Sequence, residues 1–393
     1  MHPLHIHDRL SVRGGADIHL LAILSRQAGQ HRVSLAVGRA ERDVSPPPGV
    51  DLYVVPGLGG RQRQGPAAAR RLEVLVRELS PSLLHMHNLV QPDVMAAVAN
   101  WGPAVATVQD HRSFCPGRGM VLPDGQPCAG PASPQACAAC FDDPDYAGMI
   151  TTLTAARTQT LNGFERVVVL SNYMAQQLSI AGIEPERLRV IPPFPWAPSP
   201  PSPPVLALPS GPLALASGRL VWAKGFHLLL EAWARARPPL PLVIAGEGPA
   251  RADLQNQAAQ LGLGPDRVIF TGWLPRTAVE TLLGRARFSI MPSLWAEPFG
   301  IAGLEAQARG VPVLAFDVGG VPDWLHDDHG WLLPPADVEA LRAAVQCASD
   351  PAEAQRRGHR AARFVAERFD PPELMHRLTD TYREALASGG PQG

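Results

Sequence analysis

The sequence predicts an α/β protein made of two doubly wound, Rossmann-like domains. Short β-branched or apolar runs alternate with helical patterns along the whole chain, which is typical of parallel sheets covered by helices. One proline-rich stretch interrupts this alternation near the middle. With 393 residues and 46% hydrophobic content, the chain is long enough to bury two cores. Two such domains would leave a cleft at the carboxyl ends of their sheets, where open α/β folds bind ligands.

The first half, residues 1–195, is predicted to form the N-terminal domain. Its expected strands are LHIH (4–7), VSLAVG (33–38), VDLYVV (50–55), LLHMH (83–87), AVATVQ (104–109), RVVVLS (166–171) and LRVIP (188–192), with helices between most of them. A cysteine-rich stretch at 111–145 follows the fifth strand. We expect it to be an insertion in this domain.

A linker is predicted at 196–212. Ten of the 21 residues from Pro192 to Pro212 are proline, which cannot donate to a sheet ladder and favours extended, semi-rigid chain. The composition therefore separates two domains at this point.

The second half, residues 213–370, is predicted to form a C-terminal nucleotide-binding domain. Its expected strands are PLALAS (212–217), LPLVIAG (240–246), RVIFTG (267–272), RFSIMPS (287–293), VPVLAF (311–316) and GWLLP (330–334). Terminal helices follow at 336–348 and 351–387. The last one is expected to start after Pro371 and Pro372, and residues 371–393 to cross back to the N-terminal domain.

Composition narrows the function classes. A net charge of −1 argues against nucleic acid as the main partner, because phosphate-backbone binding normally leaves a basic excess. The N-terminus has no leader pattern and no run of about 18 apolar residues occurs, so we expect a cytoplasmic protein. Peripheral contact with the inner face of the membrane stays open, with a solvated helix face as the alternative, because arginines cluster at Arg61, Arg63, Arg70, Arg71 and Arg77.

Lys224 is the only lysine, and the other 34 of the 35 basic residues are arginine. A compact ammonium on a flexible stem fits between oxygens where a planar guanidinium would collide, which suits a phosphate. The alternative is an ordinary surface lysine.

The segment PSLWAEPFGIAGLEAQARG (292–310) predicts an anion site. A loop delivers Glu297, and a helix begins near Gly300 and runs to Gly310. Free amides and the positive end of the dipole at a helix start suit a diphosphate. Glu305, about two turns along, could accept hydrogen bonds from ribose hydroxyls.

Together these residues resemble the retaining nucleotide-sugar glycosyltransferases of family 4, which have the two-domain architecture called GT-B. The resemblance rests on GRLVWAKGFHLLLEA, AGEGP (245–249), TGWLP (271–275) and the E-x7-E pair followed by ARGVPVLAFDVGGVPD, in the family's order. It covers residues 213 to about 335 well. In the N-terminal half it is limited to short stretches such as SVRGGAD (11–17).

The resemblance implies roles for particular residues. Arg219 and Lys224 would neutralise the diphosphate and stabilise the charge that grows on it, while Glu297 would contact the donor sugar. Phosphates, ribose and base would be held by Phe299, Gly300, Ile301, Glu305, Gly246 and main chain around Trp273 and Leu274. Gly14 and Gly15 would approach the donor from the opposite wall, although a plain turn is an equal alternative.

On the acceptor side the sequence departs from the family. A His is common at the end of the strand that here reads TVQDH, and this chain has Gln109, with His111 two residues on. His87, at another strand end, is a further acceptor candidate. The resemblance implies front-face displacement with retention, in which the leaving phosphate helps deprotonate the acceptor hydroxyl and no metal is required for the chemistry.

Two clusters suggest metal. Four cysteines are spaced C-x12-C-x8-C-x2-C at Cys115, Cys128, Cys137 and Cys140. This spacing favours a structural tetrahedral zinc site, with unligated or redox-labile thiols and an iron–sulfur cluster as alternatives. Histidines in LHIHD (4–8) and LLHMHN (83–88) alternate along separate strands, so we interpret them as core or cleft histidines without a third ligand.

The expected function is transfer of a sugar from a nucleoside diphosphate sugar, UDP- or GDP-linked, to a hydroxyl of a glycan, lipid-linked or small-molecule acceptor. Two alternatives stay open. A nucleotide-sugar epimerase would need further acid–base groups, and a silent sugar-nucleotide binding protein would bind donor without turnover.

Overall fold

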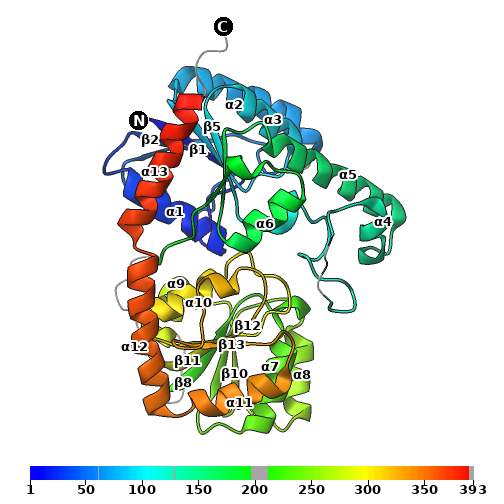
Figure 1. Cartoon of the computed structure of the whole chain (residues 1–393), viewed down its shortest axis with the longest axis vertical. Helices are drawn as coiled ribbons and strands as arrows, with labels where there is room; N and C mark the ends of the chain where they lie inside the picture. The colour runs from blue at the N-terminus through cyan, green and yellow to red at the C-terminus, as the bar shows by residue number, and fades with distance from the viewer. Residues whose placement is uncertain (61, 127, 129, 196–210, 389–393) are drawn as a thin grey trace. The chain divides into compact units, whose positions relative to one another are not determined.

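The computed structural model describes residues 1–60, 62–126, 128, 130–195 and 211–388. It divides into unit 1, Met1–Phe194 with Pro371–Gly393, and unit 2, Pro195–Asp370, each with its own sheet and helices (Figure 1). Arg61 and most of the predicted linker, 196–210, lie outside the described residues. The cleft expected between the domains stays a prediction.

Unit 1 contains a seven-stranded sheet in the order β3-β2-β1-β4-β5-β6-β7, with every pairing parallel. Its strands are β1 (Pro3–His7), β2 (Val33–Val37), β3 (Val50–Val54), β4 (Leu83–His87), β5 (Ala104–Val108), β6 (Arg166–Val169) and β7 (Leu188–Val190). The order reverses between β1 and β4, which is the switch point where open α/β sheets bind ligands.

Helices connect these strands and cover the sheet. They are α1 (Gly15–Gln27), α2 (Gly65–Leu79), α3 (Pro92–Asn100), α4 (Pro134–Cys137), α5 (Pro144–Leu161), α6 (Asn172–Ile180) and α13 (Pro371–Ser388), with short 3-10 turns η1 (Gln62–Gln64), η2 (His111–Ser113), η3 (Ala138–Cys140) and η4 (Pro185–Arg187). Tyr382 of α13 hydrogen-bonds to Gln27 of α1 and His85 of β4, so α1 and α13 share one face. The C-terminal helix begins at Pro371 itself rather than after the proline pair, because proline fits the first helical turn.

Unit 2 contains a six-stranded parallel sheet in the order β10-β9-β8-β11-β12-β13. Its strands are β8 (Leu213–Ser217), β9 (Leu242–Ala245), β10 (Val268–Gly272), β11 (Ala286–Met291), β12 (Val313–Phe316) and β13 (Trp331–Leu333). Its helices are α7 (Phe226–Ala236), α8 (Arg251–Gln260), α9 (Arg276–Leu283), α10 (Ile301–Ala308), α11 (Val338–Ala348) and α12 (Pro351–Arg368), with η5 (Trp222–Lys224) and η6 (Val321–Asp323).

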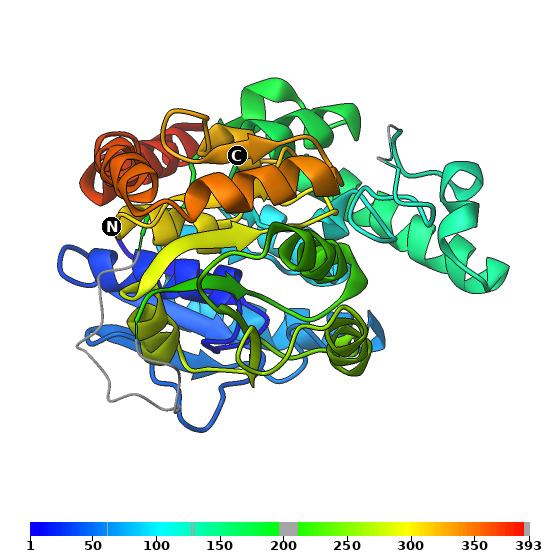
Figure 2. The same ribbon diagram turned by 90° about the horizontal axis from the view of Figure 1, so that it is seen from below.

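A continuous apolar core holds unit 2 together. One face of the sheet packs against α7, α8 and α11, where Trp233 and Phe288 are fully buried with ring centroids 6.3 Å apart. On the other face α10 packs against α12. Figure 2 shows the sheet of this unit between its helices from a second direction. This core fixes the carboxyl ends of the strands, from which the candidate site residues project.

The predicted fold class is confirmed, with shifts of a residue or two at strand ends. The strand predicted at 240–246 ends at Ala245, because Gly246 leaves the extended region at φ +157°. Among the described residues, no helix is long and apolar enough to cross a membrane. On the arginine-rich helix α2, Arg77 pairs with Glu73 at 2.5 Å and Arg71 donates to Pro56 O.

Candidate active site

The predicted donor-side residues gather at one edge of unit 2. Each follows the carboxyl end of β8, β9, β10 or β11, and these four strands are neighbours in the sheet. They are Arg219, Lys224, Gly246, Trp273, Leu274, Glu297, Phe299, Gly300, Ile301 and Glu305.

The loop after β8 carries the two predicted cations. Arg219 is exposed, and its side chain has no ion pair or hydrogen bond within the described part of the chain. Lys224 ends η5 and is followed by Gly225 at φ +67°, where a Cβ would lie 1.8 Å from Pro292 O. Glycine is therefore required for the β8 loop to approach the loop after β11.

Lys224 and Glu297 form a largely buried ion pair. Lys224 Nζ donates to Glu297 Oε1, and the side chains are 18% and 6% exposed. Ser293 Oγ donates to the same oxygen at 2.5 Å, and the ring centroid of Trp295 lies 4.7 Å from the ammonium. The only lysine of the sequence is thus held against a carboxylate 73 positions away.

Glu297 is ionised in this setting. Burial alone would raise its pKa, but the charge and hydrogen bond of Lys224, with smaller contributions from Ser293 and Trp295, outweigh burial and lower the pKa below the ordinary value. The backbone of Glu297 is also fixed, since its carbonyl accepts from Gly320 N at 2.7 Å.

The start of α10 presents an uncapped helix end. Gly300 is the N-cap residue at φ +94°, and no side chain caps the helix. Trp324 packs beneath it: its Nε1 donates to Phe299 O at 2.5 Å, and a Cβ on Gly303 would lie 2.0 Å from its ring. The first amides of α10 are thus available to an anion.

Glu305 is held by an ion-pair network. Its Oε1 accepts from Arg276 Nη1 at 2.7 Å, and Arg276 also pairs with Glu280 at 2.8 Å. Arg309 Nη2 donates to Glu280 at 2.9 Å and its Nη1 donates to Glu305 O. This network fixes the orientation of a carboxylate that the sequence assigned to ribose.

Gly246 and Gly248 allow the β8 and β9 loops to touch. A Cβ on Gly246 would lie 1.9 Å from Gly218 O, and one on Gly248 would lie 2.3 Å from Leu220 O. These contacts give both glycines a structural role, and the approach of Gly246 to a donor stays a prediction. Beyond β10, the Trp273 side chain is 54% exposed.

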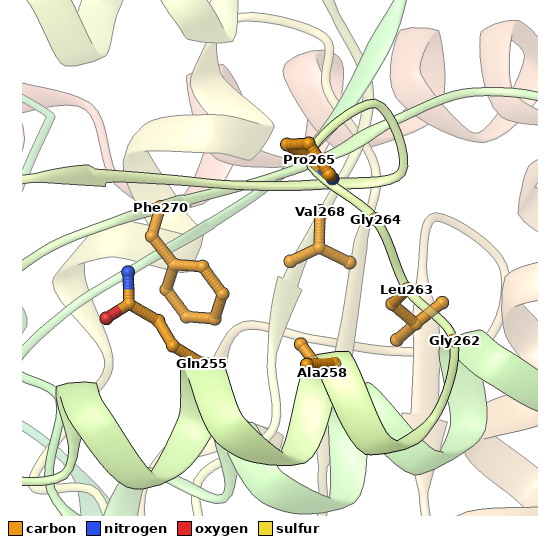
Figure 3. A pocket seen from close by; sticks show the side chains of 9 residues that line it. Gln255, Ala258, Gly262, Leu263, Gly264, Pro265, Val268 and Phe270 are labelled. Carbon is orange, nitrogen blue, oxygen red and sulfur yellow. The ribbon is translucent and has the colours of Figure 1, made fainter.

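A separate hollow of about 420 Å³ lies between α8 and the segment that leads into β10 (Figure 3). It is open and mainly apolar, and Phe270 and Val268 form part of its wall. None of the predicted site residues lines it. The predicted site residues therefore lie at the strand-end edge, apart from this hollow.

In unit 1, the predicted glycine loop lies at the start of α1. Gly14 is its N-cap with extended backbone and no side-chain cap, and Gly15 is exposed. Asp17 in the first turn pairs with Arg9 at 3.1 Å. Whether this helix start approaches a donor stays a prediction.

The three acceptor candidates lie at or near strand ends of unit 1 and are buried. His87 ends β4, Gln109 follows β5, and His111 opens η2, where its Nε2 lies 3.2 Å from Tyr173 Oη. The Gln109 side chain is within hydrogen-bonding range of the buried His19 ring of α1. Their contact with an acceptor stays a prediction.

The histidine pairs do come together, which corrects the expectation that no third ligand is near. Because β1 and β4 are neighbours with His5 opposite His85, one nitrogen each of His5, His85 and His87 lies within 4.8 Å of the others. They are buried and hydrogen-bonded as core histidines: His5 Nδ1 to His87 Nε2 at 2.8 Å, and His85 to Tyr382 Oη at 2.6 Å. Burial lowers the pKa of His5 to about 4.

The structure adds residues that the sequence patterns did not single out. His19, four residues after Gly15 in α1, is buried beside Gln109, and burial lowers its pKa to about 4. Ser293 and Arg276 contact the two predicted glutamates. The only sequence signal for His19 was that it is a polar residue on a buried helix face. Ser293 and Arg276 looked like ordinary loop and helix residues.

Comparison with known proteins identifies the class. Residues 14–193 match the family described as Glycosyl transferase 4-like domain, and residues 203–363 match Glycosyl transferases group 1. Two solved structures share the fold: sucrose-phosphate synthase from Thermosynechococcus elongatus (TM-score 0.74, 20% identity, 99% of this chain and 100% of that chain) and Anabaena Alr3699/HepE in complex with UDP and glucose (TM-score 0.71, 18% identity, 97% and 99%). Each half of the chain thus matches a glycosyltransferase family model, as the resemblance to family 4 implied, and the solved structures show that the chain has the two-domain GT-B fold.

Curated relatives match over part of their length. A glycogen synthase of Mycobacterium tuberculosis is 38% identical over 162 residues, which are 39% of this chain and 38% of that protein. O-antigen chain mannosyltransferase C of Escherichia coli is 31% identical over 175 residues, 44% and 46% of the two chains. These matches span less than half of either relative.

Proposed function

We propose that this chain is a retaining glycosyltransferase that moves a sugar from a nucleoside diphosphate sugar to a hydroxyl acceptor. The observation that carries the proposal is the ion pair of Lys224 with Glu297 beside the uncapped start of α10. Both family matches and the named relatives, a synthase and a mannosyltransferase, favour transfer over epimerisation or silent binding.

The charges at this edge suit a diphosphate. Arg219 lies in the same loop as Lys224. The start of α10, which carries about half a positive charge, follows shortly after Glu297, the ion-pair partner of Lys224. The Lys224 ammonium is already balanced by Glu297, so its full charge becomes available to the phosphate only when the carboxylate turns to another positive centre.

That centre exists in the transition state of glycosyl transfer. As the bond from the anomeric carbon to phosphate oxygen breaks, positive charge grows on the sugar ring and negative charge grows on the diphosphate. The Glu297 carboxylate would face the former and the Lys224 ammonium the latter, so the pair stabilises the separated charges more than the ground state. The acceptor oxygen then bonds to the anomeric carbon on the same face, and its proton passes to the leaving phosphate.

The remaining donor contacts follow the same edge. Glu305, oriented by Arg276, would accept from ribose hydroxyls, and main chain near Trp273 and Leu274 would meet the base. UDP is the first base to test, because the Anabaena structural neighbour is seen with UDP and glucose. In unit 1, the buried amide of Gln109 would hydrogen-bond a sugar hydroxyl where the family commonly has a histidine.

A thermal-shift screen of UDP-, GDP- and dTDP-sugars tests donor choice first. One donor at 100 times its dissociation constant is expected to stabilise the protein by about 2.7 kcal/mol. Incubation with that donor and pooled glycan, lipid-linked and small hydroxyl acceptors should then release the nucleoside diphosphate, with retained anomeric configuration in the product.

Three outcomes contradict the proposal. Isomerisation of the donor in the absence of any acceptor would indicate an epimerase. Tight donor binding with neither transfer nor slow hydrolysis would indicate a silent binding protein. A product of inverted configuration would remove the front-face mechanism.

A further inference from the structure

The cysteine-rich segment forms an excursion between η2 and α5 that projects from the rest of unit 1 (Figures 1 and 2). Among its described residues from Cys115 to Asp143, the buried hydrophobic side chains are those of Met120, Val121 and Cys137. So small an apolar cluster cannot by itself fix a segment of this length. Small units of this kind are usually held by a disulfide or a metal ion.

Backbone contacts link the cysteines of the excursion pair by pair. Met120 N donates to Cys115 Sγ at 3.4 Å, and Met120 O accepts from Cys128 N at 2.9 Å, so one residue links the first two cysteines. Gly117 lies against the other pair, since a Cβ there would lie 3.5 Å from Cys140 Sγ. Cys137 and Cys140 end the consecutive turns α4 and η3.

The surroundings of the sulfur atoms suit a metal ion. Three of the four cysteines are partly exposed, which leaves an entry path for an ion. A backbone amide that donates to sulfur, as Met120 N does to Cys115, is the kind of outer contact that orients a thiolate ligand.

We propose that Cys115, Cys128, Cys137 and Cys140 bind one zinc ion in a closed tetrahedral site that fixes the excursion. No three of their sulfur atoms lie within 4.8 Å of one another among the described residues, so the ion draws them together. In a tetrahedral site with Zn–S near 2.3 Å the sulfur atoms approach to about 3.8 Å. Among the described residues, the one group that meets that limit is His5, His85 and His87. His5 and His85 already use both of their ring nitrogens in hydrogen bonds, to His87, Gln27, Tyr382 and Thr107.

The zinc site would also position the acceptor side of the proposed enzyme. Cys115 N donates to His111 O at 2.7 Å, so the first ligand is tied directly to the turn that carries His111. Thr158 and Arg157 of α5 bind the carbonyls of Ser113 and Arg112. The role is structural, and its test does not depend on the proposed transfer reaction.

Metal content of the full chain, purified without a metal-affinity column, tests the proposal. Plasma mass spectrometry is expected to find about one zinc per chain. The double variant Cys137→Ser/Cys140→Ser should hold less than a tenth of that amount, while Cys347→Ser, which removes an exposed thiol on α11, should hold as much as the wild type.

A second measurement covers the case in which the double variant fails to fold. Titration of the Cys347→Ser chain with an organic mercurial, in the presence of a zinc-sensitive dye, should release zinc in step with modification of its four remaining thiols. After the mercurial has been removed, Co²⁺ taken up by the chain should show thiolate-to-metal charge-transfer bands. Iron with acid-labile sulfide would overturn the assignment. So would a wild-type chain that holds neither zinc nor iron and takes up no Co²⁺.

Discussion

Replacing Lys224 by methionine tests the buried ion pair most directly. The variant keeps the length of the side chain but leaves the Glu297 carboxylate 94% buried with only Ser293 and Trp295 near it, since 6% is exposed. Removing one partner of a buried pair typically costs about 3–5 kcal/mol. Because Lys224 itself is 18% exposed, we expect the lower end, about 3 kcal/mol, in the free energy of unfolding.

The assay is urea unfolding of the full chain, followed by tryptophan fluorescence, for Lys224→Met, Glu297→Gln and the double variant. The double variant should recover most of the loss, because the buried charge is then gone. Arg363→Met, which breaks the exposed pair with Glu367, is the control and should not change unfolding measurably.

The pH dependence of the unfolding free energy tests the ion pair independently. In the wild type the pKa of Glu297 lies below its ordinary value, so the stability that this group adds is lost as the pH falls through the folded-state pKa. In Lys224→Met burial acts without the ammonium and raises the pKa above the ordinary value. The variant should therefore gain stability relative to the wild type between pH 7 and pH 4.5, and parallel curves would refute the pair.

The same position tests the phosphate role. Lys224→Arg keeps the charge and can still pair with Glu297, so folding should survive. Its planar group cannot occupy the space between Trp295 and Glu297 in the same way, and turnover should fall at least tenfold, or about 1.4 kcal/mol in activation free energy. Unchanged turnover with the preferred donor would reject the role.

Three further outcomes follow from the packing. Gly225→Ala would place a Cβ 1.8 Å from a backbone oxygen of the facing loop, so it should reduce both turnover and melting temperature, whereas Gly148→Ala, in open space on α5, should reduce neither. Tyr382→Phe should cost about 1–3 kcal/mol in urea unfolding because it leaves buried partners unsatisfied, and Tyr146→Phe on the surface should cost nothing measurable. The pKa of His5 near 4 predicts that unfolding free energy falls by up to about 3 kcal/mol for this residue as the pH drops from 6.5 to 4, because the unfolded chain binds the proton first; a flat profile over that range would contradict it.

The order of strands and helices could be predicted because each element follows from the local pattern of apolar and turn residues. Runs such as VSLAV and LVIA are short, apolar and bounded by turn residues, and they form strands β2 and β9 close to the predicted positions. Gly300 marked the start of α10, since a helix beginning at an αL residue favours glycine. What the pattern could not contain was which strands are neighbours.

Strand adjacency decides the parts of the site that the sequence did not reveal. The histidines of LHIH and LLHMH looked separate because β1 and β4 are about 80 residues apart, yet the sheet places His5 opposite His85. In the same way, nothing local to Lys224 names Glu297 as its partner. A carboxylate and an ammonium far apart in sequence meet only after β8 and β11 have paired.

The presence of one lysine follows from this geometry. Its ammonium donates to the Glu297 carboxylate and lies 4.7 Å from the Trp295 ring centroid, and the next residue, Gly225, admits no Cβ. A forked guanidinium has donors in a fixed plane and cannot meet these demands together. At exposed positions such as Arg363 no such restriction exists, and arginine serves there.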